Sequence, residues 1–300
     1  MKTKTYLFAL MTMALTLGSC SDNENGIGGE TSKYITVSTS IGNMTRVATD
    51  ANGGQTFEEG DEISVYAWTG DATVAPETRE RVVNNAINKL TNGSWISNPQ
   101  MLWKNNRDKH YFIGVYPISA ISDLSAGEYT FDETKQVESD LLVAVNKDGI
   151  SYNADEQQTV PLTFTHVMAK LAVNLTYKNQ WGGIPTVEKV VVGNAAKEAT
   201  INYLTKVVTP STTAKEDFSL PEITENTKYV SVIIPQEEVT QLTIVIGGKN
   251  FVYDNGTPFK LESGKITTVN LEVGRDEIKL GDVKITNWED GSTFSGEALN

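Results

Sequence analysis

Hydrophobic and polar residues alternate along much of the chain after residue 33, and a period of two predicts β-strands. In 34–41, the first alternating stretch, Ile35, Val37 and Ile41 share one face. Further strands are predicted at 62–68, 111–116, 140–145, 161–177, 187–192, 200–208, 229–234, 242–246, 250–253, 265–273 and 283–288. A helical turn or short helix is predicted at 79–90. Many short strands with little helix indicate an all-β fold, of sandwich or barrel type.

Two interruptions of this pattern predict how the strands are divided. The apolar face changes near Met168 and Ala169, which predicts a bulge or a break in the long run at 161–177. The most polar stretch near the middle of the chain is 153–158. We therefore expect an N-terminal domain over 34–157 and a C-terminal domain over 158–300.

Charge and composition exclude several classes of function. The chain has 38 acidic and 25 basic residues, a net charge of −13, so nucleic acid phosphates and anionic lipid heads would repel it. One cysteine and two histidines cannot form an internal disulfide or a Cys/His zinc site. We expect no nucleic acid partner, no metal and no cofactor.

The N-terminal residues have the features of an export signal. Lys2 and Lys4 precede a mostly apolar run at 6–17, which is shorter than the about 20 residues of a membrane-spanning helix. The sequence Leu-Gly-Ser-Cys at 17–20 resembles a bacterial lipobox, which implies a lipid on Cys20 and cleavage before it. We therefore expect a lipoprotein signal peptide at 1–19 and, because 20–33 is polar and glycine-rich, a flexible tether there.

Four segments, taken together and in order, resemble the fimbrillin family of Bacteroides-type bacteria, which comprises pilus subunits and related adhesin lipoproteins. They are 57–66 (FEEGDEISVY), 111–117 (YFIGVYP), 140–144 (DLLVA) and 162–171 (LTFTHVMAKL). The resemblance implies two tandem β-sandwich domains of transthyretin-like, Greek-key type. It also implies a lipid-anchored precursor on the outer face of the cell outer membrane, a place in the fimbrium, and a host or bacterial surface ligand.

The resemblance also implies a mechanism of assembly. In the family, an arginine-specific surface protease cuts after an arginine behind the first strand, and a strand from another fimbrial subunit fills the vacated groove, a form of β-augmentation. Here Arg46 is the first arginine, in a small, polar stretch that follows 34–41, and exposed loops of such residues favour cleavage. Cleavage would leave Val47 as the new N-terminus and displace Ile35, Val37 and Ile41. The alternative is that Arg46 is an ordinary loop arginine.

The C-terminal residues indicate which role in a fimbrium suits the chain. After Trp288 the sequence does not alternate, and Phe294 is the one large apolar residue before Leu299. Such a segment would fill few pockets as a donor strand, which favours a tip or accessory subunit over a shaft subunit. The alternative donor is 277–288, whose apolar residues are Ile278, Leu280, Val283 and Ile285.

Candidate catalytic groups are weak in this sequence. Gly-x-Ser-x-Gly, phosphate-binding and dinucleotide-binding motifs are absent, so we do not expect an enzyme. His166 lies in an alternating apolar stretch and is expected to be structural, whereas His110 is expected at the surface. Glu58, Glu59 and Asp61 are expected to cap or solvate the turn before the strand at 62–68.

Two rival functions belong to other classes. A monomeric, lipid-anchored glycan-binding protein would use exposed tryptophans in a row, drawn from Trp68, Trp95, Trp103, Trp181 and Trp288. A surface hydrolase would need a cleft with converging carboxylates, and the sequence pattern does not indicate such a pair.

Overall fold

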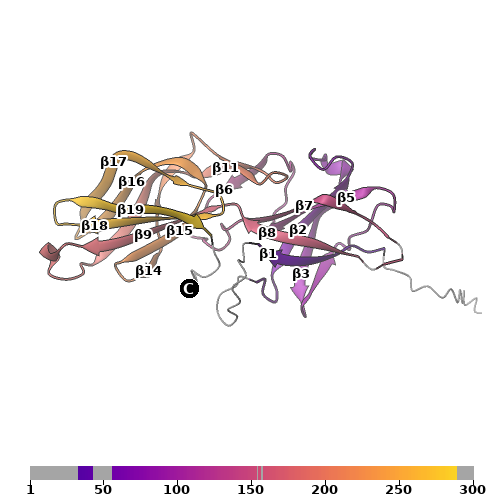
Figure 1. The fold of residues 1–300 in the computed structure, drawn as a ribbon, viewed down its shortest axis with the longest axis horizontal. Helices are drawn as coiled ribbons and strands as arrows, with labels where there is room; N and C mark the ends of the chain where they lie inside the picture. The colour runs from indigo at the N-terminus through magenta and orange to yellow at the C-terminus, as the bar shows by residue number, and fades with distance from the viewer. Residues whose placement is uncertain (1–32, 43–55, 154, 157, 289–300) are drawn as a thin grey trace, which may run out of the picture.

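The chain folds almost entirely into β-strands. The structure, a computed structural model, describes residues 33–42, 56–153, 155–156 and 158–288. These residues contain nineteen strands and two single-turn 3₁₀ helices, η1 (Thr78–Glu80) and η2 (Asn179–Trp181). The strands form four sheets spread along an elongated molecule, with the N-terminal strands toward one end and the C-terminal strands toward the other (Figure 1). The predicted all-β sandwich fold is confirmed.

A seven-stranded sheet contains most of the strands of the first half. In spatial order its members are β1 (Thr36–Ile41), β8 (Thr159–His166), β7 (Leu142–Ser151), β5 (Lys109–Tyr116), β2 (Glu62–Thr69), β3 (Val83–Thr91) and β4 (Ser94–Asn98). All neighbours are antiparallel except β1 and β8, which are parallel. The sheet surrounds a core to which β1, β2, β5 and β8 contribute buried aliphatic and aromatic side chains.

Of the helical turn or short helix predicted at 79–90, the structure contains the single turn η1, and the range from Val83 onward is the strand β3, which was not predicted. The pairing of β3 with β2 shifts register between Val83 and Ala86, where Asn85 adopts a left-handed φ of 54°. The apolar residues of β3 are three and four positions apart because the strand does not alternate across this irregularity. The sequence of this bulged strand therefore has the pattern of a helix.

Three further sheets complete the molecule. The three-stranded sheet contains β12 (Val207–Pro210), β11 (Glu198–Asn202) and β6 (Gly127–Thr130). The four-stranded sheet contains β13 (Lys215–Ser219), β10 (Val187–Ala196), β16 (Gln236–Ile246) and β17 (Lys249–Leu261). The five-stranded sheet contains β14 (Glu222–Thr224), β15 (Lys228–Ile233), β9 (Ala169–Tyr177), β18 (Lys265–Val273) and β19 (Ile278–Asn287).

The two halves of the sequence are interleaved in space. The expected break near Met168 is confirmed, since β8 ends at His166 and β9 begins at Ala169. β8 pairs with β1 and β7, and β6 pairs with β11 of the second half. One large apolar core joins Tyr66 and Ile113 to residues of the C-terminal sheets. The division at residue 157 stays a prediction, and the strand after it belongs to the first sheet.

Candidate functional site

The first strand lies in a channel between two segments distant in sequence. β1 pairs with β8 from Thr36 opposite Thr159 to Ile41 opposite Phe164. On its other side, the Ile35 N–H donates to the carbonyl oxygen of Met101 at 2.9 Å. The Trp103 N–H donates to the carbonyl oxygen of Lys33 at 3.3 Å. We call the channel formed by β8, β4 and residues 101–103 the strand slot.

The side chains of β1, and of Ile35 directly before it, divide between the core and the surface. Ile35 and Val37 are only 2% and 6% exposed, and Ile41 is half-buried against the same core. On the outer face, the hydroxyls of Thr36 and Ser40 lie 3.2 Å from those of Thr159 and Thr163 on β8. Ile35 and Val37 are therefore the main apolar anchors of the strand, and their displacement stays a prediction.

Aromatic side chains form the opposite wall of the strand slot. The indole N–H of Trp95 on β4 donates to the Thr39 hydroxyl at 2.9 Å. Trp95 packs edge-to-face on Phe57, which packs in the same way on Tyr116 and Phe164, with ring centroids 5.1–5.3 Å apart. A surface hollow of about 620 Å³ lies between β1 and β4. Sequence reasoning missed Trp95 and Phe57, because no periodicity links them to β1.

His110 packs against residues 103–104, next to the segment 101–103 that pairs with the residues just before β1. It was expected at the surface, but the structure buries it completely. Its Nε2 accepts the Lys104 N–H at 3.0 Å, and its ring packs edge-on against Trp103 at 5.0 Å. Apolar surroundings penalise the charged imidazole, so burial lowers the pKa of His110.

This environment predicts a pH dependence of stability. Asp108 raises and Lys104 lowers the pKa of His110, but burial dominates and the folded pKa lies below the unfolded value of about 6.5. Unfolded chains then bind the proton more readily, so this stability is present above about pH 6.5 and is lost as pH falls. Urea unfolding at about pH 7.5 and about pH 5.5 should show a larger loss in the wild type than in His110→Gln. Equal losses would contradict this assignment.

Three of the predicted site residues, Cys20, Arg46 and Val47, lie outside the described residues.

Three other arginines differ in exposure. Arg81 is 9% exposed, and its guanidinium donates to the carbonyl oxygens of Ile121 and Ser122 at 2.7 and 2.6 Å. Arg79 and Arg107 are exposed. Because these arginines differ in exposure, the order in which an arginine-specific protease cuts the chain shows which of them it can reach.

His166 and the turn carboxylates have structural partners. His166 Nδ1 lies 2.8 Å from Asp140 Oδ1, and its ring stacks on Trp288 with centroids 4.0 Å apart. Glu59 Oε1 accepts the Asn92 N–H, and Asp61 Oδ2 accepts the Glu58 N–H, each at 2.7 Å. Within the described ranges, no cluster of His, Cys, Asp or Glu could hold a metal ion.

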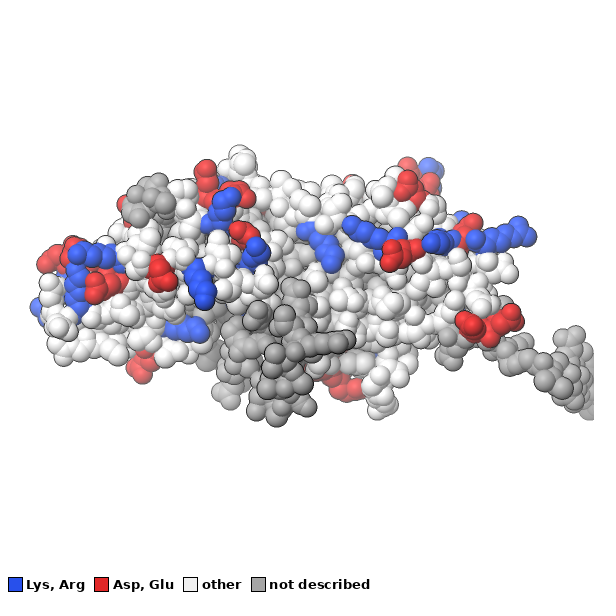
Figure 2. Space-filling model, in the orientation of Figure 1, with Lys and Arg blue, Asp and Glu red and all other residues white. Residues whose placement is uncertain are grey.

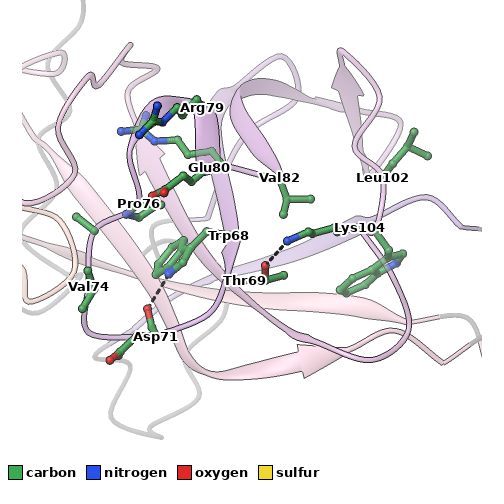
Figure 3. Close-up of a pocket in the computed structure, with 13 residues that line it drawn as sticks. Trp68, Thr69, Asp71, Val74, Pro76, Arg79, Glu80, Val82, Leu102 and Lys104 are labelled. Atoms are coloured by element: carbon green, nitrogen blue, oxygen red, sulfur yellow. Dashed lines mark hydrogen bonds between the residues drawn. The ribbon is translucent and has the colours of Figure 1, made fainter.

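A hollow lined by two tryptophans does not present them for sugar stacking. It measures about 790 Å³ and lies between the 71–82 segment and residues 102–104 (Figure 3). Trp68 and Trp103 line it but are only 2% and 8% exposed, and the Trp68 indole N–H donates to the Asp71 carbonyl oxygen at 2.9 Å. Trp68, Trp103 and Trp288 are buried and Trp95 and Trp181 are half-buried, so the tryptophans form no exposed row of the kind that the glycan-binding rival requires.

The fimbrillin-like family model matches residues 45–288, most of the chain. The chain belongs to the fimbrillin-like family. The predicted resemblance is therefore confirmed, while a search of curated proteins finds no match. Among the described residues, no helix is both long and apolar enough to cross a membrane.

Solved structures of adhesion proteins share this fold. A putative cell adhesion protein from Bacteroides ovatus is 17% identical, with a TM-score of 0.64, and the match covers 85% of this chain and 98% of that one. One from Bacteroides uniformis is 19% identical, with a TM-score of 0.61 and coverage of 78% and 93%. A fimbrial protein from Bacteroides vulgatus is 13% identical, with a TM-score of 0.52 and coverage of 86% and 100%.

Proposed function

We propose that this chain is a cell-surface fimbrial subunit or fimbrillin-like adhesin that accepts a strand from another fimbrial subunit. Cys20 would carry the lipid that anchors the precursor in the outer membrane. An arginine-specific surface protease would cut after Arg46, and the incoming strand would replace β1. The observation that carries the proposal is the position of β1, an N-terminal strand in parallel pairing with β8, with buried Ile35 and Val37.

The connectivity of β1 suits release by a single cut. β1 comes first in the sheet, and β2 is the next described strand along the chain. Cleavage after Arg46 would leave β1 attached to the remaining chain by non-covalent contacts alone, because Arg46 lies between these strands. The lipid on Cys20 would stay with the released part.

The vacated slot would bind a matching strand tightly. Burial of one aliphatic side chain contributes roughly 1.5–3 kcal/mol, and Ile35, just before β1, and Val37 within it are only 2% and 6% exposed. Loss of β1 would also leave the backbone of β8 and the carbonyl of Met101 without their partners. Both effects favour occupation of the slot by another strand of the same pattern.

The C-terminal strand supports an accepting rather than a donating role. β19 is the edge strand of the five-stranded sheet, paired with β18 and followed by the buried Trp288. Donation by 277–288, the alternative, would require β19 to leave β18 and Trp288 to leave its pocket. We therefore propose a tip or accessory subunit, with a ligand on a host or bacterial surface.

The surface charge does not indicate the chemistry of that ligand. On the face in Figure 2, acidic and basic residues are interspersed, so no patch of a single sign suggests a ligand of opposite charge.

Limited proteolysis tests this function. The chain from Ser21 onward is treated with a small amount of an arginine-specific protease, and the new N-terminus is sequenced. We expect one early cut that produces Val47, with the remainder still folded, and no such cut in an Arg46→Ala variant. Earlier cuts at the exposed Arg79 or Arg107, or resistance at Arg46, would overturn the proposal. Detergent-resistant oligomers on unboiled gels would indicate a shaft subunit instead of a tip or accessory one.

A further inference from the structure

We propose that Trp95 makes the strand slot selective for strands with a hydrogen-bond acceptor at the position of Thr39. This inference rests on the proposed function and describes the partner strand in more detail. The preferred strand has aliphatic residues at the positions of Ile35, Val37 and Ile41, and an acceptor such as Thr, Ser or Asn at the position between the last two.

The inward face of β1 is not uniformly apolar. Residues at alternate positions of a strand share a face, so Thr39 points to the same side as Ile35, Val37 and Ile41. Ile35 and Val37 are buried, whereas Thr39 and Ile41 are half-buried. At the Thr39 position the slot provides a donor, the Trp95 indole N–H at 2.9 Å. Tryptophan has no acceptor, so the occupant must supply one.

The donor is held in place by packing. Trp95 lies on β4 opposite Leu90 of β3, and its ring rests edge-on against Phe57 with centroids 5.3 Å apart. Phe57 is fixed in turn by Tyr116 and Phe164, at 5.3 and 5.1 Å. The indole N–H therefore keeps its direction when the strand changes, because rotation of Trp95 would disturb this aromatic cluster.

The hydroxyl contact of Ser40 with Thr163 discriminates less, because it is solvent-exposed and water can replace either partner. The Thr36 hydroxyl lies 3.2 Å from that of Thr159 and also donates to the Gln158 carbonyl oxygen at 3.1 Å in a half-buried contact, so Ser40 is the better comparison. The Thr39–Trp95 contact is half-buried, and an aliphatic residue there would leave the indole N–H without its partner.

The same donor would define the register of the incoming strand. A slip of two residues keeps the apolar face inward, so apolar burial alone discriminates weakly against it. After such a slip, an aliphatic residue at the position of Val37 or Ile41 would face Trp95 in place of the acceptor. Trp95 is thus a specificity-determining residue for both the sequence and the register of the donor.

Exchange of labelled peptides tests the inference. The chain from Ser21 onward is cut after Arg46 and mixed with a peptide of residues 33–42, or with the same peptide carrying Thr39→Val or Ser40→Ala. We expect the Thr39→Val peptide to bind about fivefold more weakly and the Ser40→Ala peptide to bind as the wild-type peptide does. In a Trp95→Phe chain, the preference for Thr39 should disappear.

The outcomes separate this inference from the function on which it rests. Equal affinity for the wild-type and Thr39→Val peptides would overturn the selectivity while leaving strand exchange intact. A preference that persists in Trp95→Phe would also overturn it. Entry of neither peptide would overturn the proposed function itself. If Trp95→Phe does not fold, the cut chain with Thr39→Val in its own β1 should release that strand about fivefold faster, and Ser40→Ala should not; equal release would refute the inference.

Discussion

Replacement of Val37 by Asp is expected to destabilise the chain by at least about 3 kcal/mol. Val37 is 6% exposed and lies opposite Val160 of β8 in the apolar core of the first sheet. The substitution removes a buried aliphatic side chain and places a carboxylate among the apolar side chains of this core. Urea unfolding followed by fluorescence, together with the proteolytic sensitivity of β1, measures this effect.

The neighbouring residue provides a matched control. Ser38 is exposed on the outer face of the same strand, so Ser38→Asp should change the free energy of unfolding by no more than about 0.5 kcal/mol. A loss in Val37→Asp no larger than that in Ser38→Asp would show that β1 contributes little to the core. The strand slot would then lack the apolar energy that strand exchange requires.

Replacement of Trp288 by Ala should cost about 3–5 kcal/mol of stability. The indole is 2% exposed, stacks on His166 and receives the Lys170 ammonium 4.2 Å from its ring centroid. Truncation removes a large buried ring and leaves a cavity beside a lysine that is 3% exposed. His166 is the last residue of β8 and Lys170 the second residue of β9, so this site joins the C-terminal end of the described chain to the junction between the sheets.

Two further variants serve as controls for the stability loss in Trp288→Ala. Trp288→Phe keeps an aromatic ring against His166 and should lose less stability than Trp288→Ala. Val283→Ala, on the strand β19 that precedes Trp288 but at a 37% exposed position, should have only a small effect. If Trp288→Ala and Val283→Ala were alike, β19 would be loosely held. The alternative in which 277–288 donates a strand would then be favoured.

Local patterns predicted much of this fold because the strands alternate cleanly. The inward face of β1, the break before Ala169 and the all-β class all follow from periodicity. β3 was missed, and a helical turn or short helix was predicted over 79–90, because the register shift beside Asn85 interrupts the alternation of this strand and nothing local in the sequence marks that shift.

The site was less predictable because its walls come from distant parts of the chain. The parallel partner of β1, beginning at Thr159, follows it by more than a hundred residues. The Trp95–Thr39 hydrogen bond and the burial of His110 depend on tertiary packing that no sequence period reports. The pairing of β6 with β11 likewise joins segments that the sequence pattern assigns to different domains.

A reversible covalent lock on β1 tests the central claim most directly. Ser40 and Thr163 are paired neighbours whose hydroxyl oxygens lie 3.2 Å apart, a spacing suited to a disulfide between cysteines at both positions. The chain from Ser21 onward has no cysteine of its own. After cleavage behind Arg46, a labelled peptide of residues 33–42 should enter the reduced double-cysteine chain and be excluded from the oxidised one. Equal uptake in both states would show that the peptide binds elsewhere, and would contradict the assignment of β1 as the exchanged strand.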